Sequence, residues 1–166
     1  MVRLRAPEPS DIDVFMRWEN DSRVWECGSS LAPLSHRQME RYLENYSGDI
    51  AGEGQLRLVV ECLADGSAVG AVDLFEADML NCRCGMGIII DPDAREKGYA
   101  REALDLTADY ARRRLGFHQL WCHVASDNNA SRRLFTAAGF TVAGSLRDWL
   151  RRRNAFVDVD IMQLIL

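Results

Sequence analysis

Arg95, Gly98 and Ala100 lie where an apolar segment gives way to one rich in alanine and leucine. The stretch 88–104, IIIDPDAREKGYAREAL, predicts a strand, a turn and then a helix. The first amides of a helix have no partners inside the helix, so they can bind an anion on the helix axis. The small residues at positions 98 and 100 let a bulky polyanion approach the backbone. The junction therefore predicts a phosphate site formed by the amides of 95–100.

Two familiar phosphate-binding motifs do not fit this stretch. A Walker loop requires Gly-Lys-Ser/Thr after four spacer residues, and that sequence is absent here. A dinucleotide fingerprint requires three spaced glycines after the first strand of a βαβ unit, whereas this mid-chain stretch has one glycine. What remains is the pattern Arg-x-x-Gly-x-Ala between a strand and a long helix.

Composition limits the class of protein that carries this junction. The 166 residues, 48% of them apolar, predict one domain over 1–166 with its own core. A net charge of −5 argues against nucleic acid as a partner. No apolar run approaches the roughly 20 residues of a membrane helix, and the N-terminus does not resemble a signal peptide. We therefore expect a cytoplasmic protein that is not bound to a membrane.

The cysteines are five in number and none form a Cys-x-x-Cys pair; they are at positions 27, 62, 82, 84 and 122. An odd number without such spacing predicts buried free thiols in a reducing cytosol. Cys82-x-Cys84 has no second pair to complete a metal site. We expect no metal.

The periodicity of apolar residues predicts the elements that surround the junction. In the first half we expect a strand at 3–6, a helix capped by Ser10, and a helix whose capping box is Ser35 with Gln38. A hairpin of alternating residues is expected at 56–63 and 68–76, and a third strand at 83–90. A helix at 100–115, a strand at 118–124 and a helix at 127–139 follow, and a second hairpin at 140–166 closes the chain. The order βααβββαβαββ predicts an α/β (α+β) fold with a mixed, mostly antiparallel sheet flanked by helices.

The Arg-x-x-Gly-x-Ala pattern resembles the acetyl-CoA pyrophosphate loop of the GNAT N-acetyltransferases. The segments LRAPEPSDIDVFMRWEND, DNNASRRLFTAAGF and GSLRDWLRRRNAFVDVDIMQ resemble the first strand and helix, the last helix, and the closing hairpin of one GNAT branch. That branch contains the ribosomal-protein alanine N-acetyltransferases and the bacterial spermidine N-acetyltransferases. The resemblance covers the whole chain.

The resemblance implies acetyl-CoA as co-substrate and a set of residues that contact it. The backbone of 88–90 would pair with the pantetheine arm, the 95–100 loop would bind the pyrophosphate, and the region of Asn128 would contact CoA. The implied residues are Ile88, Ile89, Ile90, Arg95, Glu96, Lys97, Gly98, Tyr99, Ala100, Asp127, Asn128 and Asn129. From the residues alone, an ordinary turn, a core strand and a simple helix cap explain the same three stretches.

The resemblance does not supply catalytic residues. The glutamate of the polyamine-acetylating relatives aligns with Gly85, and their leaving-group tyrosine aligns with Phe135. Asp73 and Glu76 are candidates for holding a cation or relaying its proton, although charged strand ends explain them equally well. His118, His123 and Tyr99 receive no catalytic role from the sequence.

The absent glutamate bears on which amine is acetylated. Deprotonating an alkylamine of pKa near 10.4 at pH 7 costs about 4.6 kcal/mol, against about 1.4 kcal/mol for an α-amine of pKa near 8. We therefore expect transfer to a primary amine, either a protein or peptide N-terminus or a small amine, by an enzyme that forms a homodimer or larger homo-oligomer. The alternatives are a polyamine acetyltransferase, a catalytically weak CoA-binding module, and an oligomeric scaffold without a ligand.

Overall fold

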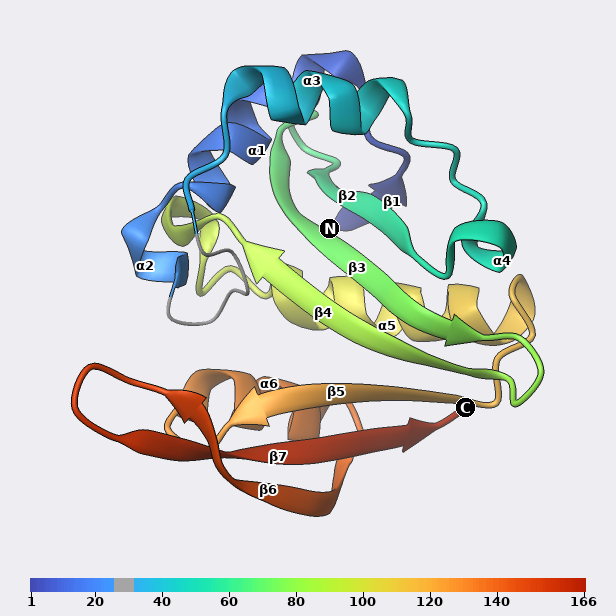
Figure 1. The fold of residues 1–166 in the computed structure, drawn as a ribbon. Coiled ribbons are helices and arrows are strands. Elements are labelled where there is room, and N and C mark those ends of the chain that lie inside the picture. Colours follow the sequence, from blue (N-terminus) through green and yellow to red (C-terminus); the bar gives the residue numbers. More distant parts are fainter. Residues whose placement is uncertain (26–31) are drawn as a thin grey trace.

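A seven-stranded sheet forms the centre of the molecule, in the order β1-β2-β3-β4-β5-β7-β6 (Figure 1). The computed structural model describes residues 1–25 and 32–166. Neighbouring strands are antiparallel except β4 and β5, which are parallel. This confirms the mixed, mostly antiparallel sheet. The strands are β1 Val2–Arg5, β2 Leu56–Cys62, β3 Ala68–Asp78, β4 Arg83–Ile90, β5 Gln119–Ala125, β6 Thr141–Arg151 and β7 Phe156–Ile165.

Helices cover the sheet unequally on its two faces. Helices α5 and α6 lie behind the strands in Figure 1, and α1 and α3 lie at the top, over β1 to β3. The front of β5 and β7 carries no helix in this view. The α-helices are α1 Ile12–Glu19, α2 Ser22–Trp25, α3 His36–Glu44, α4 Ile50–Glu53, α5 Tyr99–Arg113 and α6 Asn129–Ala137, with 3₁₀ turns η1 Pro9–Asp11 and η2 Pro92–Ala94.

Two apolar clusters occupy the two faces because successive strand residues point to opposite sides. Val59 and Ala71 pack with Phe15 and Trp18 of α1, whereas Val60 and Val72 belong to the cluster that contains α5. Strand β2 is therefore buried on both faces. The alternation of buried and exposed residues predicted for 56–63 was wrong in this respect, since Val59 to Cys62 are all buried.

Two details of the predicted N-terminal half need correction. Short helices α2 and α4 add two elements to the predicted order. Ser10 does not cap α1, because the turn η1 begins there with Pro9 at its first position, where the fixed φ of proline is favourable. The Asp11 carboxylate closes this turn by accepting from the backbone N–H of Glu8 at 2.8 Å. The capping box of α3 is confirmed, with reciprocal bonds between Ser35 and Gln38.

The thiols are largely buried, as expected. Cys62, Cys84 and Cys122 are buried free cysteines, and burial raises the pKa of Cys84 to about 11 and that of Cys122 to about 12. Cys82 is only half-buried, because it lies in the turn before β4 rather than in the strand, so its predicted burial was wrong. Cys27 lies outside the described residues.

In the described part of the chain, no group of three or more histidine, cysteine or carboxylate side chains is arranged to hold a metal ion. No described helix has the length and apolar character required to cross a bilayer.

Candidate functional site

Strands β4 and β5 are paired only where they begin. The parallel pairs are Arg83 with Gln119, Cys84 with Leu120, and Gly85 with Trp121. Beyond Gly85, residues 86–90 of β4 pair with β3 and, within the described residues, with no strand on the other side. The two strands diverge from this point in Figure 1. The free edge of β4 presents backbone N–H and C=O groups at strand spacing, which an extended ligand can pair with.

The loop that follows β4 leaves its amides without backbone acceptors. Glu96 and Gly98 have positive φ angles of 64° and 82°, and Gly98 is the N-cap residue of α5. Among the described residues, no backbone hydrogen bond is donated by the amides of 95–101. A Cβ at Gly98 would meet nothing within 4 Å, so glycine is needed there for its conformation and the space above it is open. These residues are all exposed or half-buried, and the loop can hold a polyanion.

Asp91 anchors the start of this loop from within the protein. It is 5% exposed and accepts a hydrogen bond from Trp18 Nε1 at 2.9 Å and another from the backbone N–H of Asp93 at 3.0 Å. Arg17 also pairs with it. Burial alone would raise the pKa of Asp91, but these hydrogen bonds and Arg17 outweigh burial and lower it. Local sequence places Asp91 only in the turn after the strand, because its partners Arg17 and Trp18 lie far away in the chain.

The predicted strand 88–90 combines core packing with a free edge. Ile88 packs with the α5 cluster and Ile89 with the α1–α3 cluster, while Ile90 is 9% exposed. In the loop itself, Arg95 Nε donates to the Ile90 carbonyl at 3.4 Å, so this side chain folds back along β4. The three isoleucines thus hold β4 in the sheet by their side chains and leave its backbone edge available.

The predicted residues at the start of α6 have structural partners. Asn128 is the N-cap residue, and its Oδ1 accepts from Ser131 N at 3.0 Å. Both Asp127 carboxylate oxygens accept from Arg152 at 3.0 Å, and this pairing lowers the pKa of Asp127. Asn129 is exposed at the first position of the helix. The helix-cap interpretation of Asn128 is confirmed, and Asp127 ties the β6–β7 hairpin to the start of α6.

Aromatic rings occupy the place where β4 and β5 meet. Phe75 of β3 lies opposite Gly85, and a Cβ at Gly85 would lie 2.4 Å from the Phe75 ring. The Phe75 ring meets Trp121 edge to face at 5.3 Å between centroids. Position 85 therefore has no room for a side chain unless the ring moves. At the position where the resemblance implies a glutamate, the Phe75 ring fills the space instead.

Phe135 is a core residue. It is 4% exposed and packs edge to face against Phe140, with 5.1 Å between ring centroids. Its ring belongs to the same apolar cluster as α5. No polar atom is available at this position to protonate a leaving group.

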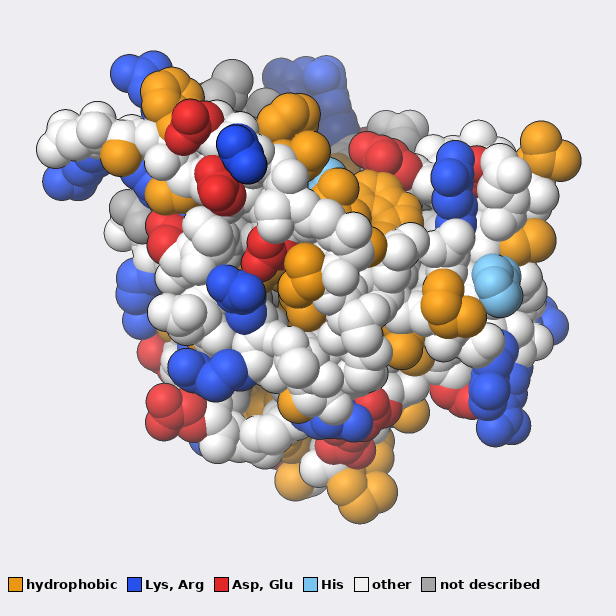
Figure 2. Space-filling model, turned by 90° about the horizontal axis from the view of Figure 1, so that it is seen from below, with side chains coloured by type: hydrophobic (Ala, Val, Ile, Leu, Met, Phe, Trp, Pro, Cys, Tyr) orange, Lys and Arg blue, Asp and Glu red, His pale blue; other side chains and the backbone are white. Residues whose placement is uncertain are grey.

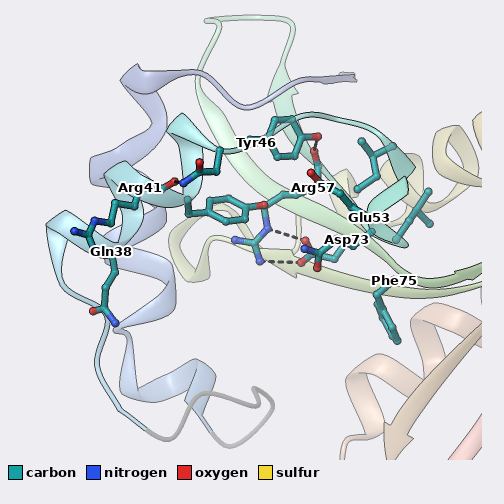
Figure 3. Close-up of a pocket in the computed structure, with 12 residues that line it drawn as sticks. Gln38, Arg41, Tyr46, Glu53, Arg57, Asp73 and Phe75 are labelled. Carbon is teal, nitrogen blue, oxygen red and sulfur yellow. Dashed lines mark hydrogen bonds and ion pairs between the residues drawn. The ribbon is translucent and has the colours of Figure 1, made fainter. Parts of the chain in front are cut away.

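A pocket of about 640 Å³ opens beside Phe75, on the face that carries α1 and α3 (Figure 3). At its base, Arg57 pairs with Asp73 through bonds of 2.7 and 3.0 Å. Arg57 also contacts Glu19 at 2.9 Å. Burial opposes the charge of Arg57, but these partners together raise its pKa. The lining residues are Gln38, Arg41, Tyr42, Asn45, Tyr46, Glu53, Gln55, Leu56, Arg57, Asp73, Leu74 and Phe75.

The structure separates the two catalytic candidates. Asp73 lies in the pocket, where both of its carboxylate oxygens accept from Arg57, so the cation that it holds in this structure is that guanidinium. Glu76 is exposed at a bulge of β3 with a φ of 49° and does not line the pocket. Asp78, two residues further on, accepts from the backbone and side chain of Asn81 and is a turn residue.

The mixed sheet, the diverging parallel pair and the exposed loop after β4 together form the fold of solved N-acetyltransferase structures. A model of the acetyltransferase (GNAT) domain matches residues 2–141. The chain belongs to the GNAT acetyltransferase family, and it is an acyltransferase that acts on an amine.

The comparisons place it beside polyamine-acetylating relatives. It is 34% identical to the spermidine N(1)-acetyltransferase of Escherichia coli K12 over 150 residues, which is 87% of this chain and 75% of the relative. A crystal structure of the Vibrio cholerae spermidine N-acetyltransferase with CoA and spermine matches with a TM-score of 0.86 and 26% identity, over 99% of this chain and 95% of the other. A dodecameric structure of the Vibrio enzyme matches with a TM-score of 0.83, at 27% identity, over 99% and 93% of the two chains.

Proposed function

We propose that residues 1–166 act as one domain that transfers the acetyl group of acetyl-CoA to a primary amine by direct attack in a ternary complex. The observation that carries this proposal is the continuous path from the free edge of β4, residues 86–90, into the loop 95–100 with its unpaired amides. The pyrophosphate of CoA would bind at the loop, and the pantetheine arm would run along β4. This chemistry needs no metal ion.

The path has a defined end. Counting back from Ile90, Gly85 lies five residues along the strand, which is about 17 Å at strand spacing. An extended arm cannot continue past Gly85 between the strands, because β4 and β5 are paired there. The thioester would therefore stop near Gly85, beside Phe75 and the pocket.

The pocket supports an acceptor with a single amine of low pKa, such as a peptide N-terminus. Its charged lining residues are Arg41 and Arg57 against Glu53 and Asp73, so the formal charges cancel. A polycation gains little attraction from such a lining. A monoamine that carries an apolar group next to its nitrogen can pack that group against the tyrosines and Phe75 that also line the pocket.

A polyamine is the second candidate acceptor, and the spermidine N-acetyltransferases among the relatives favour it. Glu19, which adjoins the pocket and contacts Arg57, adds a carboxylate on that side. The two acceptors differ in amine pKa by about 2.4 units, so at pH 7 the neutral, reactive fraction of the peptide amine is about 200-fold larger than that of the polyamine.

The experiment is CoA release from acetyl-CoA at pH 7 with an alanine-terminated peptide and with spermidine, alongside calorimetry with CoA. A higher kcat/KM for the peptide supports the proposal. A clearly higher value for spermidine replaces it with the polyamine function. Binding of CoA without turnover across a broad amine panel indicates a CoA-binding module, and no binding of CoA indicates a scaffold.

We also propose that the protein is a cytoplasmic homodimer or larger homo-oligomer. The dodecameric Vibrio structure supports an assembly. So does the exposed end of the β6–β7 hairpin, where Trp149 and Phe156 are each 58% exposed. Figure 2 shows basic and hydrophobic side chains together on the projecting part of the molecule at the left of the view. Light scattering on the purified chain tests the assembly, and a monomer would contradict it.

A further inference from the structure

His123 lies on the acceptor side of the place where β4 and β5 separate. Along β5, Leu120, Cys122 and Val124 are buried toward α6. The alternate residues Trp121 and His123 point to the opposite face, which is also the face that Phe75 shares with the pocket. His123 is exposed there, two residues beyond the last pair of β4 with β5.

The His123 ring packs against Trp121, the residue of β5 in that last pair. Alternate residues of a strand are about 6.6 Å apart along the chain, yet the rings of Trp121 and His123 lie with centroids 5.0 Å apart. Trp121 pairs with Gly85, and paired strands are about 4.8 Å apart, so the backbone of His123 lies at least about 8 Å diagonally from Gly85. The contact with Trp121 keeps the imidazole beside the residue that pairs with Gly85, at the end of the β4 path.

Both ring nitrogens of His123 lack a polar partner in the described part of the chain. Apart from the ring contact with Trp121, no described side chain forms a hydrogen bond or ion pair with His123. Its neighbours on the same face are uncharged: Ile161 opposite it and Gln163 opposite Trp121 on β7, and Gly85 and Gly87 on β4. The ring nitrogens are therefore available to a ligand.

The other charged groups on this face either pair with one another or lie on strands or strand ends away from His123. On β2 and β3, Arg57 and Asp73 pair with each other, and Glu76 is exposed at the bulge. At the far end of β5, Asp127 is paired with Arg152. His123 is thus the titratable group between these two ends.

We infer that His123 is the general base of the acetyl transfer, a role that rests on the proposed function. The amine nitrogen attacks the thioester carbonyl carbon near Gly85, and the carbon–sulfur bond breaks. The proton from the amine passes to a ring nitrogen of His123, directly or through one water molecule. CoA leaves as the thiolate, takes up a proton, and the imidazolium returns its proton to the solvent, so the products are the N-acetyl amide and CoA.

This assignment explains how the chain acts without the glutamate of its relatives. The carboxylate is absent from β4, where Phe75 fills the space at Gly85, and the base lies instead one strand away on β5. Imidazole side chains change charge between pH 5 and 8, which suits a base for an α-amine. Phe75 and Trp121 form an apolar wall beside the reacting atoms.

The test compares His123→Ala with the wild type and with His118→Ala, using the acceptor that the wild type turns over best. His118 is also exposed and lies just before β5, so its replacement is a matched control. General-base catalysis contributes about 10²–10⁴-fold. We expect kcat to fall at least about 100-fold in His123→Ala and to change little in His118→Ala, with CoA affinity unchanged in both.

The pH profile separates a chemical role from a structural one. For the wild type, log kcat/KM should rise with a slope of about two at the acid end, because both the imidazole and the amine must lose a proton. The slope in His123→Ala should be about one throughout, and added imidazole should restore part of its rate. Equal profiles and no rescue would overturn the role of His123. If the wild type itself transfers no acetyl group to any amine, the proposed function fails instead.

Discussion

The two ends of strand β4 differ in how closely they follow the GNAT pattern. At the C-terminal end, Gly98 has a positive φ, and within the described residues the amides of 95–101 have no backbone acceptors. At the other end, Gly85 stands where the resemblance implies a glutamate, and the Phe75 ring fills the space. Under the proposed function these are the binding end and the reacting end, and the family pattern is followed at the first and not at the second.

This difference has a physical reason. A phosphate is bound by backbone amides, which any sequence supplies once the loop has the correct conformation. Proton transfer depends on one side chain at one place, and several positions around the thioester can supply it. Under the proposed function, the group that transfers the proton can therefore lie on another strand, whereas the phosphate site requires the loop after β4.

The largest effect is expected from Gly98→Glu at the binding end. A carboxylate would enter the space above the loop and repel the pyrophosphate, so CoA affinity should fall more than about 100-fold. Calorimetry with CoA measures this. Gly66→Glu is the control, since Gly66 also has a positive φ, of 73°, and open space around it. Similar CoA affinity in the folded Gly98→Glu variant and the control would remove the loop from the binding site.

Asp91→Ala tests whether the binding end depends on its buried anchor. Trp18 Nε1 would lose its acceptor inside the protein, which should lower the free energy of unfolding by about 3 kcal/mol in urea titrations. Asp93→Ala is the control, because the Asp93 side chain is 81% exposed, and it should cost less than about 0.5 kcal/mol. Equal losses would show that Asp91 is not an anchor.

The same variant gives a pH dependence of known sign. The pKa of Asp91 is lowered in the folded protein, so its contribution is present above the unfolded value near 3.9 and fades as pH falls through the lower folded value. The stability difference between wild type and Asp91→Ala should therefore shrink as the pH falls below about 4. A difference that grows on acidification would contradict the lowered pKa.

Gly85→Glu tests the reacting end. The new side chain would collide with Phe75, at a cost of about 2 kcal/mol in unfolding free energy. Phe75→Ala opens that space, so the double variant should lose less stability than the sum of the single variants, by at least about 1 kcal/mol. A double-mutant cycle measures this coupling. Strict additivity would mean that Phe75 is not what excludes a side chain from position 85.

The smallest effect is expected from Phe135→Tyr. The added hydroxyl would enter a packed core beside Phe140, at a cost of about 1 kcal/mol, and the rate should be unchanged or raised. Phe140→Tyr, at the other ring of the pair, is the control for the stability change. A large loss of rate in Phe135→Tyr alone, with CoA binding intact, would show that this ring contacts the reacting atoms.

Local patterns explain what could be predicted about the binding end. The strand–loop–helix sequence at 88–104, the capping box of Ser35 and the hairpin turn at 65–66 depend on residues within a few positions of one another. The short helices α2 and α4 and the turn at Pro9 were missed because four residues or fewer give little periodic signal.

The sequence by itself determined the types of elements, their order around the loop, and the absence of a glutamate at position 85. Only the tertiary structure decided which groups meet. The bond between Trp18 and Asp91 joins residues 73 positions apart, and the Arg57–Asp73 pair crosses from β2 to β3. The register of β4 with β5 brings Gly85 beside Trp121, whose ring contacts His123. Such contacts follow from how strands pair and faces pack, and local sequence does not encode that pairing.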